Sequence, residues 1–285
     1  MRWIVAALIL ALSACKPPPP EVVTPALWEV TGDHGEQAWL LGTIHALPAP
    51  VTWRSAPVEA ALAGSDQLVL EIANINDPAA MQKIYAQLAA SPGLPPLESR
   101  VVPAVKPKLL ALMRELKLDP GKFAETETWA AALTIASAAQ GEADADFGID
   151  REILNAAKGK PVAELEGTAV QLGIFDRLPE ADQRDLLMAV VVEAAQVDDD
   201  DRLGNAWRSG DMAVMAAETR NGMMADPELR RALLTDRNNA WANRLSVMLQ
   251  QGARPLVAVG ALHMAGAEGL PALLAARGYK VRRLQ

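Results

Sequence analysis

The sequence predicts an α/β protein: a central β-sheet built from two β-α-β units, one at each end of the chain, with a large helical region between them. Two observations carry this prediction. Apolar runs near both ends finish in Gly-x-x-His, at Ala38 to His45 and at Leu256 to His263. The residues between the two units, approximately 78–251, repeat their apolar positions at the spacing of helices.

The N-terminal unit is expected to contain a hairpin, a short helix and a second buried strand: Leu27–Val30, Ala38–Leu41, 57–63 and 67–72. Gly and Asp between the first two strands are typical of a hairpin turn. His34 lies in that turn, where we expect it to be solvated. Glu71 lies near the end of the last strand, so this unit supplies both a histidine and a carboxylate.

The C-terminal unit repeats this plan, with a strand at 256–259, a helix at 268–277 and a closing strand at 279–284. Such β-loop-α-β connections are almost always right-handed and make their strands parallel. Glycine before each histidine permits a sharp exit from the strand. His45 and His263 are therefore expected at strand ends, where open α/β sheets usually bind ligands.

The middle of the chain is expected to be helical, and its helices could form a lid or a wall over the site. Apolar spacing predicts helices at Pro78–Ala90, Val105–Leu118, Thr128–Gln140, Ile149–Lys158, Pro179–Gln196 and Pro227–Gln251. Pro161–Glu166 is the one clear strand among them. No linker divides the chain, so we expect one domain over residues 27–285.

The N-terminus predicts export and lipid anchoring. Ile4 to Leu12 is apolar but shorter than the roughly 20 residues that span a bilayer, which is typical of a secretory signal. Leu12-Ser13-Ala14-Cys15 resembles a bacterial lipobox, so residues 1–14 are expected to be removed and Cys15 to carry lipid such as palmitate. A plain signal peptide and a buried N-terminal helix are the alternatives.

Residues 15–26 are rich in proline and predict an extended tether. The expected location is therefore the bacterial cell envelope, on the periplasmic face of the outer membrane if the source is Gram-negative. The chain has 27 basic and 35 acidic residues and a net charge of −8. An acidic chain without a basic run is a poor candidate for binding nucleic acid.

His45, His263 and Glu71 would form a set of two histidines and one carboxylate. Such a set suits zinc, manganese, cobalt or iron. A bound metal can lower the pKa of its water to roughly 7 and polarise a carbonyl, as hydrolysis requires. The structural alternative is that each histidine only forms hydrogen bonds to a neighbouring loop.

A second carboxylate would be useful as a proton shuttle. Glu164 and Glu166, near the end of the central strand, are the candidates, with Asp150 behind them.

Gly42-Thr43-Ile44-His45 and Gly260-Ala261-Leu262-His263 resemble the paired GxxH motifs of the TraB/GumN family. That family includes the TIKI metalloproteases and is related to the erythromycin-esterase and ChaN-like proteins. Further matching segments are Leu68–Glu71, Phe147–Asp150, Gly159–Val162, Leu165-Glu166, Arg237-Asn238, Gly266, Gly269-Leu270 and Gly278-Tyr279. Leu262-His263-Met264 departs from the Gly-His-Leu of many members but keeps the histidine.

This resemblance implies a metal-dependent hydrolase or peptidase site at His45, Glu71 and His263, with a divalent ion such as Mn, Co or Zn. Glu166 or Glu164 would act as an auxiliary base. Arg237 and Asn238 would bind substrate or an acid, unless they are a solvated or capping pair, and Asp150 would also bind substrate. The substrate would be a peptide or another small molecule.

The rival hypothesis is a non-catalytic envelope lipoprotein that binds metal, haem or a peptide in the same cleft. A third reading is a scaffold in which the motifs only brace strand ends. Family membership alone does not decide among them, because one fold can host several functions.

Overall fold

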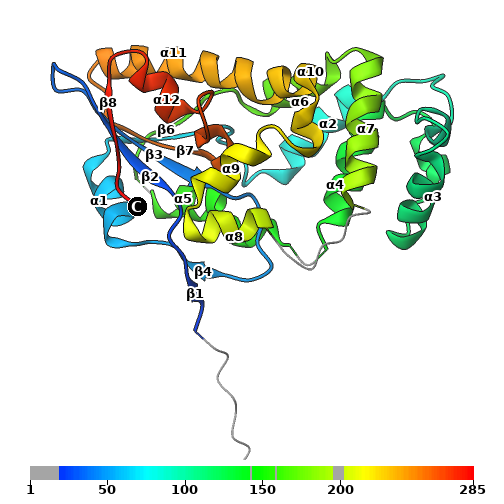
Figure 1. Cartoon of the computed structure of the whole chain (residues 1–285), viewed down its shortest axis with the longest axis horizontal. Helices are drawn as coiled ribbons and strands as arrows, with labels where there is room; N and C mark the ends of the chain where they lie inside the picture. Colours follow the sequence, from blue (N-terminus) through cyan, green and yellow to red (C-terminus); the bar gives the residue numbers. More distant parts are fainter. Residues whose placement is uncertain (1–18, 142, 158, 195–201) are drawn as a thin grey trace, which may run out of the picture.

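A six-stranded mixed β-sheet forms the centre of the molecule, with strand order β6-β5-β7-β3-β2-β8 (Figure 1). The computed structural model describes residues 19–141, 143–157, 159–194 and 202–285. The six strands are β2 (Leu27–Thr31), β3 (Gln37–Thr43), β5 (Gln67–Leu70), β6 (Val162–Glu164), β7 (Pro255–Gly260) and β8 (Lys280–Arg283). β6, β5, β7 and β3 are mutually parallel, whereas β2 pairs antiparallel with β3 and β8. The predicted α/β class is confirmed.

The two predicted units contribute strands that run in one direction. β3 and β5 both pair parallel with β7, which lies between them. β8 is separated from β3 by β2, and two antiparallel steps give β8 the direction of β3. Each unit therefore spans part of the sheet instead of forming a pair of adjacent strands.

Alternate residues of the central strands pack on opposite faces of the sheet, as the two-residue period of a strand requires. Leu41 and Ala258 face a core with α1 (Ala56–Gly64), α5 (Ile149–Ala156) and α8 (Arg202–Ser209). Leu40 and Val257 face a second core.

That second core contains residues of α11 (Asp236–Gln250) and α12 (Leu270–Ala275). Since β3 and β7 are covered on both sides, their residues form continuous apolar runs, as expected for buried parallel strands.

A third apolar core lies within the helical region. It joins buried residues of α2 (Pro78–Ala89), α3 (Lys106–Glu115), α4 (Thr128–Ala139), α7 (Glu180–Ala194) and α10 (Pro227–Arg230). α6 (Thr168–Asp176) packs on α2. Figure 1 shows these helices to one side of the sheet, in the right half of the view. The helical region thus has an apolar core of its own, separate from the two cores that cover the faces of the sheet.

Most predicted helices are confirmed, but some differ in their ends or are divided into shorter helices. The predicted helix at 227–251 is α10, a π-helical turn at Arg231–Thr235 and α11. The expected helix at 268–277 is reduced to α12. α6, α8 and α9 (Met212–Glu218) were not predicted. α6 begins after Gly167 without a side-chain cap, so the usual sign of a helix start is missing there.

The packed chain begins before Leu27, within the segment expected to form a tether. β1 (Glu21–Val22) pairs parallel with β4 (Val51–Thr52), and Val23 is buried. The predicted signal peptide and Cys15 lie outside the described residues. Among the helices that the structure describes, none is long and apolar enough to cross a membrane.

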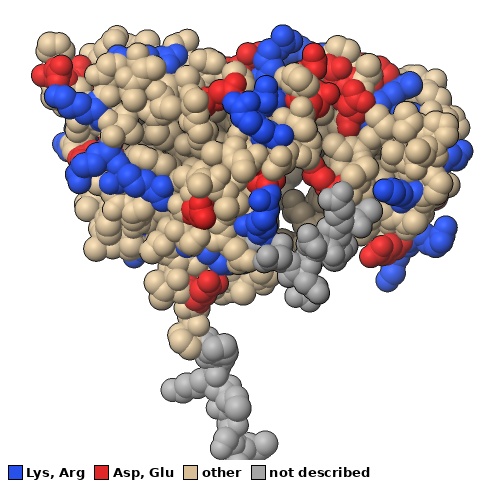
Figure 2. Space-filling view, viewed as in Figure 1, with Lys and Arg blue, Asp and Glu red and all other residues tan. Residues whose placement is uncertain are grey.

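The surface carries both signs of charge. On the face that Figure 2 shows, lysine and arginine side chains are interspersed with aspartate and glutamate. His34 is exposed in the hairpin turn, as predicted.

Candidate functional site

The carboxyl ends of three parallel strands bring the candidate residues to one edge of the sheet. His45 follows β3, Glu71 follows β5 and His263 follows β7. In the β3–β7 register, Thr43 pairs with Gly260, so the two Gly-x-x-His segments leave the sheet side by side. This is the edge at which open parallel sheets usually bind ligands.

The three side chains converge beside Gly260. A β-carbon placed on Gly260 would lie 3.4 Å from Oε1 of Glu71 and 3.6 Å from Nε2 of His45. It would also lie 3.8 Å from Cδ2 of His263. The structure thus brings both histidines and the glutamate together around one point, as the sequence predicted.

His45 is oriented by Asp150. Its Nδ1 lies 2.7 Å from Oδ2 of Asp150, and the other carboxylate oxygen accepts a hydrogen bond from the Thr43 hydroxyl at 2.6 Å. The nearby carboxylate of Asp150 raises the pKa of His45 to about 9. Because 72% of the His45 side chain is exposed, water screens part of this attraction. The imidazole is therefore held at Nδ1 while its Nε2 edge stays accessible.

The start of α5 is fitted closely to the first histidine loop, and this places Asp150. The Ile149 N–H donates to the carbonyl of Ile44 at 2.9 Å. A β-carbon on Gly148 would lie 2.1 Å from the carbonyl oxygen of His45, so only glycine allows this approach.

The carboxylate of Glu71 is buried and accepts three hydrogen bonds. Oε1 accepts from the Gly260 N–H at 2.8 Å. Oε2 accepts from Gln171 Nε2 at 2.9 Å and from Arg237 Nη2 at 2.8 Å. A carboxylate offers about four acceptor positions, so one remains for a ligand or a water molecule.

Glu71 is ionised at neutral pH. Burial by itself would raise its pKa. Attraction to Arg237, to protonated His45 and, once it is protonated in acid, to His263, together with the Gly260 N–H, outweighs burial and lowers the pKa of Glu71 to about 2.

Arg237 is the central cation of the site. Its Nε and Nη2 donate to Glu166 at 2.9 Å each, and Nη2 also donates to Glu71. Its Nη1 donates to the Leu233 carbonyl and lies 3.2 Å from Nε2 of His263. Burial opposes the charge of the guanidinium, but Glu166 and Glu71 raise the pKa of Arg237 above its ordinary value.

These contacts fix the neutral form of His263. Arginine only donates hydrogen bonds, so Nε2 of His263 accepts and the proton is on Nδ1. That Nδ1 donates to Oδ1 of Asn238 at 2.6 Å, and the Asn238 amide donates in turn to the Glu268 carbonyl at 2.7 Å. The ring also lies against Trp241, with ring centroids 4.4 Å apart.

His263 resists protonation. Burial lowers the pKa of His263 most, and the positive charges of Arg237 and His45 lower it further. Glu71 raises this pKa, but the net effect lowers it to about 3. The two histidines of the site thus differ: a protonated, exposed His45 and a neutral, buried His263.

A pocket of about 250 Å³ opens beside His45 and Glu71. Its polar lining residues are His45, Glu71, Asp150, Arg151 and Gln171, and its apolar lining residues are Leu70, Ile72, Ile75, Met81 and Ala145. Convergent polar groups at one end of an apolar pocket are the usual arrangement of a ligand site.

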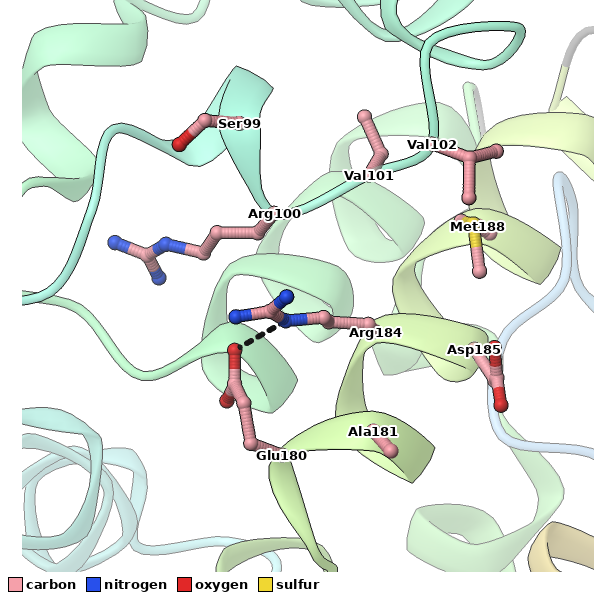
Figure 3. Close-up of a pocket in the computed structure, with 9 residues that line it drawn as sticks. All are labelled: Ser99, Arg100, Val101, Val102, Glu180, Ala181, Arg184, Asp185 and Met188. Carbon is pink, nitrogen blue, oxygen red and sulfur yellow. Dashed lines mark hydrogen bonds and ion pairs between the residues drawn. The ribbon is translucent and has the colours of Figure 1, made fainter.

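A larger cavity of about 520 Å³ lies in the helical region (Figure 3). Arg184 and Glu180 form an ion pair across one turn of α7 there. Arg100, also in its wall, donates to the carbonyls of Pro95, Thr126 and Phe123. Arg100 therefore holds neighbouring segments together and Arg184 is paired within its own helix, so the histidine pocket is the stronger candidate.

The other residues considered from the sequence occupy different positions. Glu166 belongs to the buried network, because it also accepts from the Trp241 indole at 3.0 Å. Glu164 lies outside it and accepts from the Ala73 N–H. Arg237 lies in the site, whereas Asn238 acts on His263 instead of facing the pocket.

Sequence reasoning missed Asp150 as the partner of His45, and it missed Gln171 and Trp241 entirely. Asp150 was named from the sequence, but as a reserve carboxylate behind Glu164 and Glu166 and not as the residue that holds His45. Gln171 lies on α6, which the sequence did not predict, so no local pattern pointed to it.

The fold and the site define an α/β protein with a histidine and carboxylate cluster at the carboxyl edge of its parallel strands. The chain belongs to the TraB/PrgY/gumN family, whose sequence model matches residues 26–283. It is 27% identical over 263 residues to the uncharacterized protein YbaP of Shigella flexneri, covering 86% of this chain and 90% of YbaP. It is also 27% identical over 252 residues to YbaP of Escherichia coli (strain K12), covering 82% and 86%. No solved structure matches the chain.

Proposed function

We propose that this chain is an envelope hydrolase that cleaves a peptide or ester bond with water as the nucleophile and His45 as the proton-transfer group. One observation carries the proposal: the Nε2 edge of His45 and an oxygen of Glu71 face one point beside Gly260, at a pocket of about 250 Å³. Among the described residues that line this pocket there is no serine, threonine or cysteine, which favours water as the nucleophile.

His45 would remove a proton from water as the water oxygen bonds to the carbonyl carbon. The same Nε2 would then return the proton to the leaving amine or alcohol as its bond to that carbon breaks. Asp150 would hold the ring and stabilise the imidazolium, as the aspartate of a Ser-His-Asp triad does. The remaining acceptor position of Glu71 can orient the attacking water.

A divalent metal bound by both histidines and Glu71 fits the chemistry of these side chains. Asp150 and Asn238 also hold the imidazole rings in the way that partners of metal-binding histidines do. However, Arg237 donates to Oε2 of Glu71 and to Nε2 of His263, which are lone pairs that such a metal would need.

Within the residues that the structure describes, no group of three or more His, Cys, Asp or Glu side chains could hold a metal ion. The present arrangement therefore does not fit an ion on all three residues, and we assign it no step in the reaction. Binding of Mn, Co or Zn stays a prediction that the experiment below addresses.

The test is hydrolysis of N-acyl amino-acid p-nitroanilides and p-nitrophenyl esters by the purified full-length protein, with and without a chelator. We expect turnover in both conditions. The His45→Ala variant should lose about 100-fold or more in kcat/KM, the range of general-base catalysis. An unchanged melting temperature would show that this loss is not unfolding.

Two results would overturn parts of this proposal. Activity lost with the chelator and restored by Mn, Co or Zn would establish the metal-dependent form. Ligand binding without turnover would establish the rival, a binding lipoprotein. A haem-binding version has less support, since pockets for drug-sized ligands usually begin at about 300 Å³.

Envelope anchoring through Cys15 is part of the same proposal, and the lipobox-like Leu12–Cys15 segment supports it. The wild-type protein should fractionate with membranes and carry lipid on its first residue by mass spectrometry. The Cys15→Ser variant should lose that lipid, and an unmodified wild-type cysteine would contradict the proposal.

A further inference from the structure

The apolar half of the histidine pocket is continuous with the reacting groups. Leu70 ends β5, and Ile72 and Ile75 follow it in the loop to α2. Met81, in the first turns of α2, completes this wall. His45 and Glu71 line the same pocket, so a group against this wall lies next to the proposed reaction centre.

The loop that carries this wall is held at both ends. The Asp77 N–H donates to the Asn74 carbonyl at 2.9 Å, and the Asp77 side chain caps α2 through the Ala80 N–H at 3.0 Å. The Asn74 side chain accepts from the Thr168 hydroxyl at 2.8 Å. Ile75 is therefore presented by a preorganised loop, which lowers the entropy cost of binding.

The pocket is small and divided by polarity. About 250 Å³ is below the volume that usually holds a drug-sized ligand. Ile72, Ile75 and Met81 offer no hydrogen-bond partners for hydroxyl groups, so a sugar ring placed there would lose its bonds to water without replacement.

We infer that this wall is a specificity subsite for one aliphatic side chain, of the size of leucine, carried by the substrate next to the bond that is cleaved. The role of this subsite in choosing the bond to cleave rests on the proposed function, whereas binding of an aliphatic side chain there does not. Ile75 and Met81 are the specificity-determining residues. The substrate class is a peptide or amino-acid derivative with an aliphatic residue at that position.

The first test measures binding without catalysis. The full-length protein carries methionine labelled with carbon-13 in its methyl group, and the Met81→Leu variant identifies the Met81 signal. Titration with N-acetyl-leucinamide should shift this signal saturably, whereas N-acetylglycinamide should require at least tenfold higher concentrations. Equal shifts with both compounds would overturn the subsite.

The second test compares kcat/KM for the p-nitroanilides of N-acetyl-leucine and N-acetylglycine. Even one methylene in an apolar pocket contributes roughly 10-fold or more, so a preference for leucine of at least 10-fold is expected. Ile75→Ala should reduce this ratio at least threefold. Val247→Ala, at an exposed apolar position of α11, is the matched control and should leave the ratio unchanged.

The outcomes separate the two proposals. Selective binding of the leucine compound without hydrolysis supports the subsite and contradicts the hydrolase. Hydrolysis without a preference for leucine supports the hydrolase and overturns the subsite. A ratio that is unchanged in Ile75→Ala, with wild-type melting temperature, also overturns it.

Discussion

At the scale of single residues, Arg237 decides the electrostatics of the site. One guanidinium bridges the buried carboxylates of Glu71 and Glu166 and also contacts His263. Two buried carboxylates without this cation would repel each other and lack their strongest donors. Arg237 therefore supplies the positive charge that a metal ion would otherwise provide.

Replacing Arg237 tests this role. Arg237→Gln should lower the free energy of unfolding by about 3–5 kcal/mol, because it leaves a buried charge uncompensated. It also frees lone pairs of Glu71 and His263, so the variant should bind Zn more tightly than the wild type does. Calorimetric titration and denaturant unfolding measure both effects.

Arg244→Gln is the matched control on the same helix, since Arg244 bonds only the Leu165 carbonyl among the contacts the structure gives. Wild-type protein that binds Zn as tightly as Arg237→Gln would contradict the role assigned to Arg237.

Asp150 sets the protonation of His45, which gives a pH prediction. Asp150 raises the pKa of His45 to about 9, and a general base works only when deprotonated, so kcat/KM should rise with pH toward 9. Asp150→Asn removes the charge, so the pH at which kcat/KM reaches half of its maximum should fall from about 9 toward the ordinary histidine pKa of about 6.5. If kcat/KM rises with the same midpoint pH in the wild type and in Asp150→Asn, a group other than His45 controls the rise.

At the scale of elements, the site depends on how closely α5 meets the loop after β3. Gly148→Ala puts a β-carbon where the His45 carbonyl lies, so the helix start must move. We expect a loss of about 1–3 kcal/mol in the free energy of unfolding, as for other overpacked sites. Activity should fall as well, because Asp150 would move away from His45.

Gly121→Ala is the comparison, since its nearest neighbour is the flexible side chain of Asp119 at 3.3 Å. Equal effects of both substitutions on activity would contradict the positioning role of α5.

At the scale of the whole molecule, the buried site makes stability depend on pH. The folded-state pKa of His263 is about 3, so below about pH 6.5 the unfolded chain takes up a proton that the folded protein refuses. Glu71, with a pKa of about 2, adds a loss of stability as pH falls below about 4.5. Both effects favour the unfolded state in acid.

Urea unfolding between pH 7.5 and 4.5 measures this dependence. Between pH 6.5 and 4.5 the wild type should lose stability toward acid, with His263 contributing up to about 1.4 kcal/mol per pH unit. Above pH 6.5 His45, whose pKa is raised to about 9, acts in the opposite direction, because the folded protein then binds the extra proton. His263→Gln should be less stable than the wild type at pH 7.5, but its free energy of unfolding should change less between pH 6.5 and 4.5. An equally steep curve in this variant would mean that His263 is not the group responsible.

The sheet and the shared location of the two histidines could be predicted because their signals are local. An apolar run that ends in Gly-x-x-His needs only neighbouring residues to specify a strand and its exit, and parallel strands place such exits at one edge. The position of Glu71 at the same edge could be predicted for the same reason, because it follows a third parallel strand. The helices α6, α8 and α9 were not predicted; α6, which carries Gln171, starts after Gly167 with no side chain to cap it, so its start has no local signal.

By itself, the sequence determined that two histidines and a glutamate would meet, and that the N-terminus has a lipobox-like segment. Only the tertiary structure decided what each of them touches. Asp150 is 105 positions from His45, and Arg237 is 166 positions from Glu71. Such pairs depend on how helices pack against the sheet edge, which no local pattern encodes. That packing leaves His45 charged and accessible, keeps His263 neutral and buried, and places Arg237 between the acids.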